Sequence, residues 1–443
     1  MRAPLDSLAA KLDSAAIGED IYALAAAIYP ICRSITGDGV RETLRHMAKH
    51  IDLAVHEVPS GTPVFDWTVP TEWNIKEAYI ANAAGERIVD FRNCNLHVLG
   101  YSAPIRARLS LSELKPHIFT LPDQPDLIPY RTSYYSERWG FCMTHRQFEA
   151  LPDQDYDVVI DSGLSDGALT YGEYFHRGEA DAEFLLTAHS CHPSLANDNC
   201  SGLALLTQLA ARLAEHKTRY SYRFLFAPGT IGAITWLARN ADGVHRIKHG
   251  LVISCVGDGG GPVYKKSRRG DTQIDRAMAH VLRHEAPQSA ILDFFPYGYD
   301  ERQFCAPGFD LPVGLFQRSQ FGTFPEYHTS ADNLDFISPE QLALSFRMIV
   351  RVIDLIESNC TFRNTSPYGE PQLGRRGLYA AIGGDKDAAA KNMAMLWVLN
   401  LSDGAHSLLD IAERAGLPFP LVAQTALLLQ DNGLLTTDLG HPE

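Results

Sequence analysis

At 443 residues, of which 45% are hydrophobic and 21% charged, the chain is long enough for two or three domains of a folded protein. Its formal net charge of −14 at pH 7 argues against a general role in binding nucleic acid. It contains no run of about 18 apolar residues, so we expect no membrane span.

The N-terminus and the cysteines favour a cytoplasmic location. Residues 1–30 carry acidic side chains and lack the continuous apolar core of a signal peptide. The eight cysteines are scattered without CxxC spacing, which indicates reduced thiols in place of a disulfide framework.

The first part of the chain changes from helical to strand patterns. Residues 18–50 have a helical pattern that is interrupted at 32–39. From about 52 to 175 short alternating strands and turns follow, and no helix longer than two turns is convincing between 64 and 140. We therefore expect an inserted β-rich domain over residues 61–149.

Strands and helices alternate between residues 180 and 355. The strands are predicted at 183–188, 221–227, 250–256 and 312–316, and the helices at 202–215, 230–240, 272–286 and 339–357. Such alternation predicts an α/β fold with a mixed sheet flanked by helices. We assign residues 1–60 and 150–362 to this domain.

A small helical module is predicted at the C-terminus. A Pro- and Gly-rich linker is expected at 363–384, and residues 385–443 have the proportions of a winged-helix-like domain. Strong bases are rare beyond residue 390, where only Lys391 and Arg414 occur. Six acidic residues lie in the same stretch: Asp403, Asp410, Glu413, Asp431, Asp438 and Glu443. Because a phosphate backbone requires the opposite balance, we expect a protein–protein or dimerisation role, with a homodimer as one possibility.

Two polar loops carry the candidate metal ligands. His192 and Asp198 lie between a predicted buried strand and an amphipathic helix, and His328 lies in a second polar cluster far along the chain. Strand ends in open α/β sheets collect ligands, and imidazole and carboxylate suit zinc. His189 is an alternative ligand or a supporting residue. Asp258, between a strand and a triple-glycine turn, is either a fourth ligand or an ordinary turn residue.

Several longer motifs identify a family resemblance. They are Cys32–Gly37, Phe65–Ile75, Thr132–Cys142, Cys191–Ser194, Asn197–Asn199, Asp300–Gln303 and Glu326–Asn333. With them the chain resembles the bacterial aminopeptidase-like DUF4910 family, which carries an inserted DUF2172 region and a C-terminal winged helix. That family is similar to the M28 zinc aminopeptidases. The resemblance implies a mixed sheet between helices, a bridging role for Asp198 at a co-catalytic zinc pair, and a ligand role for His328.

One departure from the M28 pattern concerns the proton acceptor. M28 enzymes place two adjacent glutamates about 30 residues after the bridging aspartate, whereas residues 223–234 here contain no carboxylate. This loss favours one zinc ion over two and leaves the general base to be replaced. Glu326 is a candidate because it shares a face with His328 if that segment is extended, and Glu301 is the other.

Basic and aromatic residues suggest how a substrate is held. Arg268 and Arg269 either bind a substrate carboxylate or belong to a surface loop, and Arg302 is a further candidate for substrate binding. The aromatic segment 132–141 either forms a wall over the cleft or anchors the inserted domain.

These patterns lead to two hypotheses of different class. The first is a zinc-dependent hydrolase that resembles an aminopeptidase and cleaves an amide or peptide bond with metal-activated water. Its substrate would be a small peptide or an amino-acid derivative such as an aminoacyl sugar. The second is a non-catalytic or regulatory small-molecule-binding protein on the same scaffold, with the winged helix as its interaction module.

Overall fold

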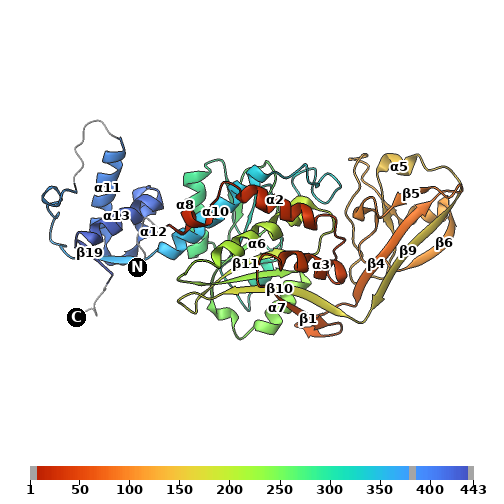
Figure 1. Ribbon diagram of the computed structural model, residues 1–443, viewed down its shortest axis with the longest axis horizontal. Coiled ribbons are helices and arrows are strands. Elements are labelled where there is room, and N and C mark those ends of the chain that lie inside the picture. Colours follow the sequence, from red (N-terminus) through yellow and green to blue (C-terminus); the bar gives the residue numbers. More distant parts are fainter. Residues whose placement is uncertain (1–6, 379–385, 438–443) are drawn as a thin grey trace. The chain divides into compact units, whose positions relative to one another are not determined.

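The computed structural model describes residues 7–378 and 386–437, which form two compact units (Figure 1). The larger unit comprises Ala15–Thr272 and Ala290–Phe346. The smaller unit comprises the described residues of 1–14, 273–289 and 347–443. No helix in the described part of the chain is long and apolar enough to cross a membrane.

An eight-stranded mixed sheet organises the larger unit. Across the sheet its strands are β1 (Ala54–Pro59), β10 (Ala168–His176), β12 (Ser221–Ala227), β11 (Glu183–His189), β13 (Ile247–Ile253), β16 (Val313–Gln317), β14 (Val263–Lys265) and β15 (Ala290–Leu292). Strands β12, β11, β13 and β16 are parallel, whereas β1 and β10 pair antiparallel with their neighbours. Strand β14 pairs antiparallel with β16 and parallel with β15. The mixed α/β sheet predicted from the sequence is therefore confirmed.

Helices cover both faces of this sheet. The connection from β11 to β12 runs through α6 (Gly202–Leu213), and the connection from β12 to β13 returns across the sheet through α7 (Ile231–Asn240). Because crossovers between parallel strands are right-handed, these opposite directions place α6 and α7 on opposite faces, as Figure 1 shows. Helices α2 (Ile17–Ile28) and α3 (Asp38–Met47) pack beside α6 and β10, respectively.

The long predicted elements between 180 and 355 are all present, but three short ones were not predicted. Strands β14 and β15 and helix α9 (Glu301–Phe304) have three or four residues each. Elements of this length show too little periodicity to be recognised. Helix α10 (Pro339–Ser358) begins in the larger unit and ends in the smaller one.

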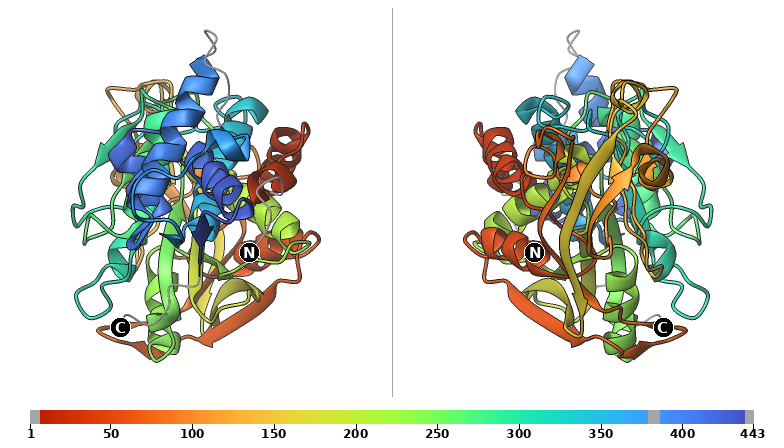
Figure 2. Two further views of the ribbon diagram at one scale, coloured as in Figure 1. Left: turned by 90° about the vertical axis from the view of Figure 1, so that its left-hand side faces the viewer. Right: turned by 90° about the vertical axis from the view of Figure 1, so that its right-hand side faces the viewer.

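A second, four-stranded sheet forms the β-rich part of the larger unit. Its order is β5 (Arg87–Asp90), β4 (Glu72–Ala81), β9 (Asp155–Ser165) and β6 (Ile105–Ser110). The long strands β4 and β9 lie side by side (Figures 1 and 2). Strand β9 lies beyond residue 149, where we expected the insert to end. The short elements around this sheet are β2 (Pro63–Val64), β3 (Trp67–Thr68), β7 (Ile118–Phe119), β8 (Phe141–Cys142), α4 (Leu111–Leu114) and α5 (His145–Glu149).

The smaller unit contains the predicted winged-helix module. The helices of the smaller unit are α1 (Leu8–Leu12), α8 (Gln273–Glu285), α11 (Lys386–Leu401), α12 (Leu408–Ala415) and α13 (Phe419–Asp431), together with the end of α10. Its sheet has the order β18 (Asp403–Ser407), β17 (Thr361–Asn364) and β19 (Leu435–Thr436). Residues 363 and 364, expected in the linker, thus belong to strand β17. The linker residues 379–384 and the end of the module at 438–443 lie outside the described residues.

A buried ionic contact joins the starts of the two sheets. Both carboxylate oxygens of Glu72, the first residue of β4, accept hydrogen bonds from Arg41 on α3, at 2.8 and 2.6 Å. Glu72 also accepts a hydrogen bond from the backbone of Ala168 in β10. These contacts, chiefly the bond from Arg41, lower the pKa of Glu72 to about 2, although its burial opposes the shift.

We predict that Glu72→Gln lowers the free energy of unfolding by about 2 kcal/mol at pH 7, because it breaks a charge-assisted bidentate contact. The folded carboxyl has the lower pKa, so its stabilisation is complete above the ordinary value of 4.5 and is lost as the pH falls towards 2. Urea unfolding at pH values from 7 down to 3 should show that the difference in the free energy of unfolding between wild type and variant becomes smaller as the pH falls. Glu215→Gln, on an exposed residue, is the control. A gap that is absent at pH 7 would contradict the prediction.

Candidate metal centre

Four potential metal ligands meet near the carboxyl end of β11. His189 is the last residue of β11, and His192 follows in the next loop. Asp198 lies in the segment Ala196–Ser201, which leads into α6, and His328 comes from the loop between β16 and α10. Asp198 and His189 are buried, whereas His192 and His328 are partly exposed.

The four side chains are centred on the carboxylate of Asp198. His189 Nε2 lies 2.8 Å and His192 Nδ1 lies 3.5 Å from Asp198 Oδ1. His328 Nε2 lies 3.0 Å from the other oxygen, Oδ2. The ligand atoms of His192, Asp198 and His328 are all within 4.8 Å of one another. The fold thus brings the three ligands predicted from the sequence together and adds His189 beside them.

Two of these nitrogen atoms lack hydrogen-bond partners. His189 Nε2 and His192 Nδ1 are buried, and neither forms a hydrogen bond within the described part of the chain, although both approach Asp198. A buried polar atom without a partner costs about 1–3 kcal/mol. Three imidazoles and one carboxylate are also a donor set that zinc prefers. The residues present therefore fit a bound metal ion.

The electrostatics of the cluster favour the protonation states that bind metals. Burial and the neighbouring His192 lower the pKa of His189 to about 3, and burial also lowers the pKa of His328. Burial alone would raise the pKa of Asp198, but His192 and His328 hold it well below its usual range. The site therefore combines an ionised Asp198 with two imidazoles, those of His189 and His328, whose neutral form is favoured.

Two further aspartates hold the loop that carries Asp198. Asp332 accepts hydrogen bonds from the backbone N–H groups of Asn197 and Asp198, at 2.6 and 3.0 Å. Asp258 accepts hydrogen bonds from Asn197 Nδ2 at 2.8 Å and from Ser319 Oγ at 2.6 Å. Asp258 thus binds the loop and does not join the group of converging ligand atoms. Asp332 was not among the predicted residues, although it lies four positions after His328.

The two glutamates considered as general bases are not among the converging ligand atoms. Glu301 forms an ion pair with Lys265 at 2.7 Å, and both side chains are fully buried. Glu326 is half-buried, and its side chain makes no hydrogen bond within residues 7–378 and 386–437. Neither glutamate lines the cavity described below. The general-base role therefore finds no direct support at either position.

Asp300 is a buried carboxyl group that the sequence did not single out. A Cβ atom built on Gly229 would lie 3.5 Å from Asp300 Oδ1 and 3.2 Å from Cβ of His189. Asp300 is therefore close to the segment at which the M28 pattern places its glutamates. Burial and the adjacent Glu301 raise its pKa to about 7, against the opposing effect of Arg302. Its sequence signals were its place at the start of the family motif Asp300–Gln303 and its position next to Glu301.

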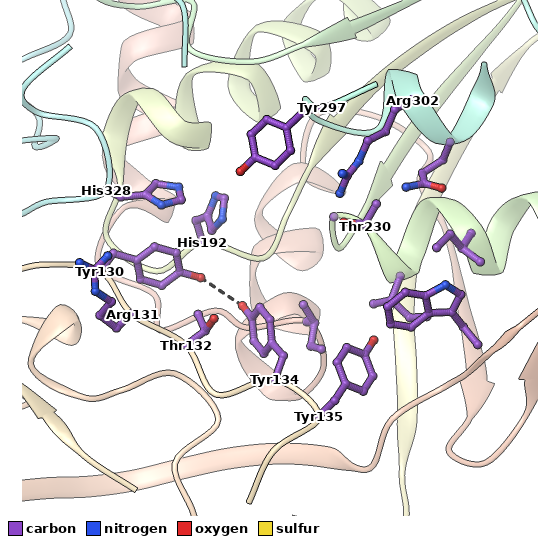
Figure 3. A pocket seen from close by; sticks show the side chains of 16 residues that line it. Tyr130, Arg131, Thr132, Tyr134, Tyr135, His192, Thr230, Tyr297, Arg302 and His328 are labelled. Atoms are coloured by element: carbon purple, nitrogen blue, oxygen red, sulfur yellow. Dashed lines mark hydrogen bonds between the residues drawn. The ribbon is translucent and has the colours of Figure 1, made fainter. Parts of the chain in front are cut away.

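A cavity of about 580 Å³ opens beside the cluster (Figure 3), a volume typical of small-molecule sites. His192 and His328 form part of its wall, together with Arg302. Five aromatic side chains also line it: Trp67, Tyr130, Tyr134, Tyr135 and Tyr297. Arg268 and Arg269 do not line the cavity, and both contact Asp310 instead.

Both interpretations of the aromatic segment 132–141 apply, to different residues. Tyr134 and Tyr135 line the cavity, and the hydroxyl group of Tyr134 is hydrogen-bonded to that of Tyr130 at 3.1 Å. Trp139 instead stacks on His117, with ring centroids 3.6 Å apart. The segment therefore supplies part of the cavity wall and also packs within the β-rich part.

The fold and the histidine–aspartate cluster define an aminopeptidase-like protein. The chain belongs to the family described as domain of unknown function DUF4910, whose model matches residues 22–359. A winged helix-turn-helix model matches residues 360–437. The family resemblance seen in the sequence is thereby confirmed.

Known relatives agree with this assignment. A Clostridium acetobutylicum protein named "Putative polysaccharide biosynthesis protein with aminopeptidase-like domain" is 54% identical over 94% of this chain and 95% of its own length. The crystal structure of a "putative peptidase" from the same organism has a TM-score of 0.90 and 52% identity, and the match covers 95% of this chain and 96% of that one. A peptidase M28 precursor from Shewanella amazonensis shares the fold, with a TM-score of 0.57, 15% identity, and coverage of 80% and 95%.

We predict that Asp258→Ala lowers the free energy of unfolding by about 3 kcal/mol, because it leaves the buried donors of Asn197 and Ser319 without an acceptor. Chemical denaturation measures this change. Glu326→Ala, which removes no hydrogen bond of the described chain, should alter stability by less than about 0.5 kcal/mol. Equal stabilities for the two variants would show that Asp258 is not needed to hold the loop.

Proposed function

We propose that this protein is a zinc-dependent hydrolase that cleaves an amide bond in a small substrate. The observation that carries the proposal is the convergence of three imidazoles on Asp198 beside the cavity, where two buried nitrogens approach the carboxylate but form no hydrogen bond within the described residues. His189, His192, Asp198 and His328 would hold one ion. A zinc ion, when bound, polarises a carbonyl group and lowers the pKa of water.

The residues of the chain have separable roles in this proposal. Asp332 and Asp258 keep Asp198 in place through hydrogen bonds to its loop. We propose Asp300 as the proton acceptor, because Glu301 is paired with Lys265 and Asp300 lies beside Gly229 and His189. The carboxylate of Asp300 would take a proton from the attacking water, and its carboxylic acid would return it to the leaving nitrogen.

The proposed substrate is a small peptide or an amino-acid derivative. The cavity volume of about 580 Å³ suits a molecule of this size. The name of the Clostridium acetobutylicum relative, which refers to polysaccharide biosynthesis, supports an aminoacyl or acylamino sugar over a long peptide. The five aromatic side chains that line the cavity offer flat surfaces for a sugar ring or an apolar side chain.

We predict that the purified protein binds about one equivalent of zinc, and that His192→Ala and His328→Ala each weaken binding at least about 100-fold. Metal content after dialysis and competition with a chromophoric chelator measure both quantities. His245→Ala, on an exposed histidine remote from the cluster, should leave zinc binding unchanged. Absence of zinc from the wild-type protein would exclude the proposed function, whereas two equivalents would require a second ion.

We predict that Asp300→Asn lowers amide hydrolysis by about 100-fold or more while zinc content stays unchanged, because the variant cannot accept a proton. A panel of aminoacyl and N-acylaminoacyl p-nitroanilides, assayed with the zinc-loaded protein, gives the rates. Glu326→Gln is the comparison. If Glu326→Gln loses activity and Asp300→Asn does not, the proton acceptor is Glu326.

A further inference from the structure

The charged groups around the cavity have one sign. In a chain with 53 acidic and 39 basic residues, none of the residues lining the cavity is Asp or Glu. Two arginines, Arg131 and Arg302, line it together with His192 and His328. The wall of the cavity is therefore positive although the protein as a whole is acidic.

Arg302 lacks the acidic partners that Arg41 and Arg223, two other half-buried arginines, possess. Its Nε atom is buried without a hydrogen bond, and its guanidinium forms no ion pair within the described residues. Arg41 and Arg223, by contrast, each bind two glutamates. Of its neighbours in sequence, Glu301 is bound to Lys265, and no hydrogen bond joins Asp300 to Arg302. Asp300 and Glu301 are near enough to interact with Arg302 electrostatically, but neither forms an ion pair with it within the described residues. A half-buried guanidinium with an unsatisfied donor favours an external anion.

The direction of Arg302 agrees with a role in binding a ligand. In Figure 3 its side chain extends from α9 towards the open part of the cavity, between Tyr297 and Thr230. Its guanidinium carbon lies 5.6 Å from the centre of the Tyr297 ring. Arg131 lies on another side of the cavity, next to Tyr130 and His328, and also forms no ion pair in the part of the chain that is described.

The same walls are unsuited to a free amino terminus. An ammonium group that leaves water needs a carboxylate or several acceptors to replace its hydration. No residue that lines the cavity carries a carboxylate, although Asp300 lies behind Gly229, and the guanidinium groups of Arg131 and Arg302 repel an ammonium group from more than one side. A carboxylate or phosphate group, in contrast, matches the planar donors of a guanidinium in two parallel hydrogen bonds.

We propose that the cavity selects a substrate with an anionic oxygen group, a carboxylate or a phosphate, and that Arg302 binds this group. An aminopeptidase-type substrate with a free amino terminus is disfavoured. The placement of the scissile amide near His192 and His328 rests on the proposed hydrolase function, whereas the anion site at Arg302 can be tested without it.

Isothermal titration calorimetry with matched probes tests the anion site. N-acetyl-L-phenylalanine carries the carboxylate, N-acetyl-L-phenylalaninamide lacks it, and L-phenylalaninamide has a free amine instead. We expect the acid to bind at least about 10-fold more tightly than either amide. Arg302→Gln should abolish this preference, and Arg302→Lys should restore it only in part, because an ammonium lacks the bidentate geometry. Arg268→Gln, on an arginine that contacts Asp310, should retain it.

Phenyl phosphate separates the two anion sources. Tighter binding of phenyl phosphate than of the acid, with the same dependence on Arg302, identifies phosphate as the group, and the reverse order identifies carboxylate. The proposal is overturned if L-phenylalaninamide binds best or if Arg302→Gln keeps the preference. Failure of both anionic probes to bind at about 10 mM would also overturn it.

Zinc content and hydrolysis are measured on the same samples. An Arg302-dependent preference in a protein without zinc would refute the hydrolase and leave the anion site standing. If the wild-type protein has normal zinc content and hydrolysis but shows no preference for the acid, the anion site alone is refuted.

Discussion

The carboxylate of Asp198 is fully buried and ionised, and much of the larger unit is arranged around the need to compensate its charge. A buried carboxylate without a counter-charge would cost many kcal/mol or would become protonated. Here His189, His192 and His328 approach its two oxygens, and Asp332 accepts hydrogen bonds from the backbone N–H groups of Asn197 and of Asp198 itself. Because burial lowers the pKa of His189 and of His328, these two imidazoles favour the neutral form, and the compensation they offer is incomplete without a cation. This imbalance is the physical reason to expect a metal ion.

Carboxylates are scarce around the cluster. The segment that would carry the paired glutamates of the M28 pattern contains Gly229 and Thr230, and the buried Asp300 lies beside it. The cavity is lined by aromatic rings and arginines, and no Asp or Glu is among its lining residues. The fold shared with an M28 protein therefore does not by itself fix the charge pattern of the site.

The β-rich part contributes to the cavity as well as to the architecture of the larger unit. Trp67, Tyr134 and Tyr135 come from the region between β2 and β9 and line the same cavity as the histidines of the main sheet. The contacts of Glu72 with Arg41 and Ala168 tie the first strand of the second sheet to α3 and β10. Removal of this part would therefore take away one wall of the cavity, so that substrate binding depends on both sheets.

By itself, the sequence determined the long elements and the candidate ligands that the fold brings together. Helices and strands between residues 180 and 355 follow hydrophobic periodicity, and His192, Asp198 and His328 stand out as polar residues at strand ends. Only the tertiary structure decided which carboxylates and arginines are available. In the sequence Asp258 is a candidate metal ligand and Glu301 a candidate general base. In the structure Asp258 accepts a hydrogen bond from Asn197, and Glu301 forms an ion pair with Lys265. The availability of a charged side chain depends on partners that are distant in the chain, and local sequence patterns do not encode those contacts.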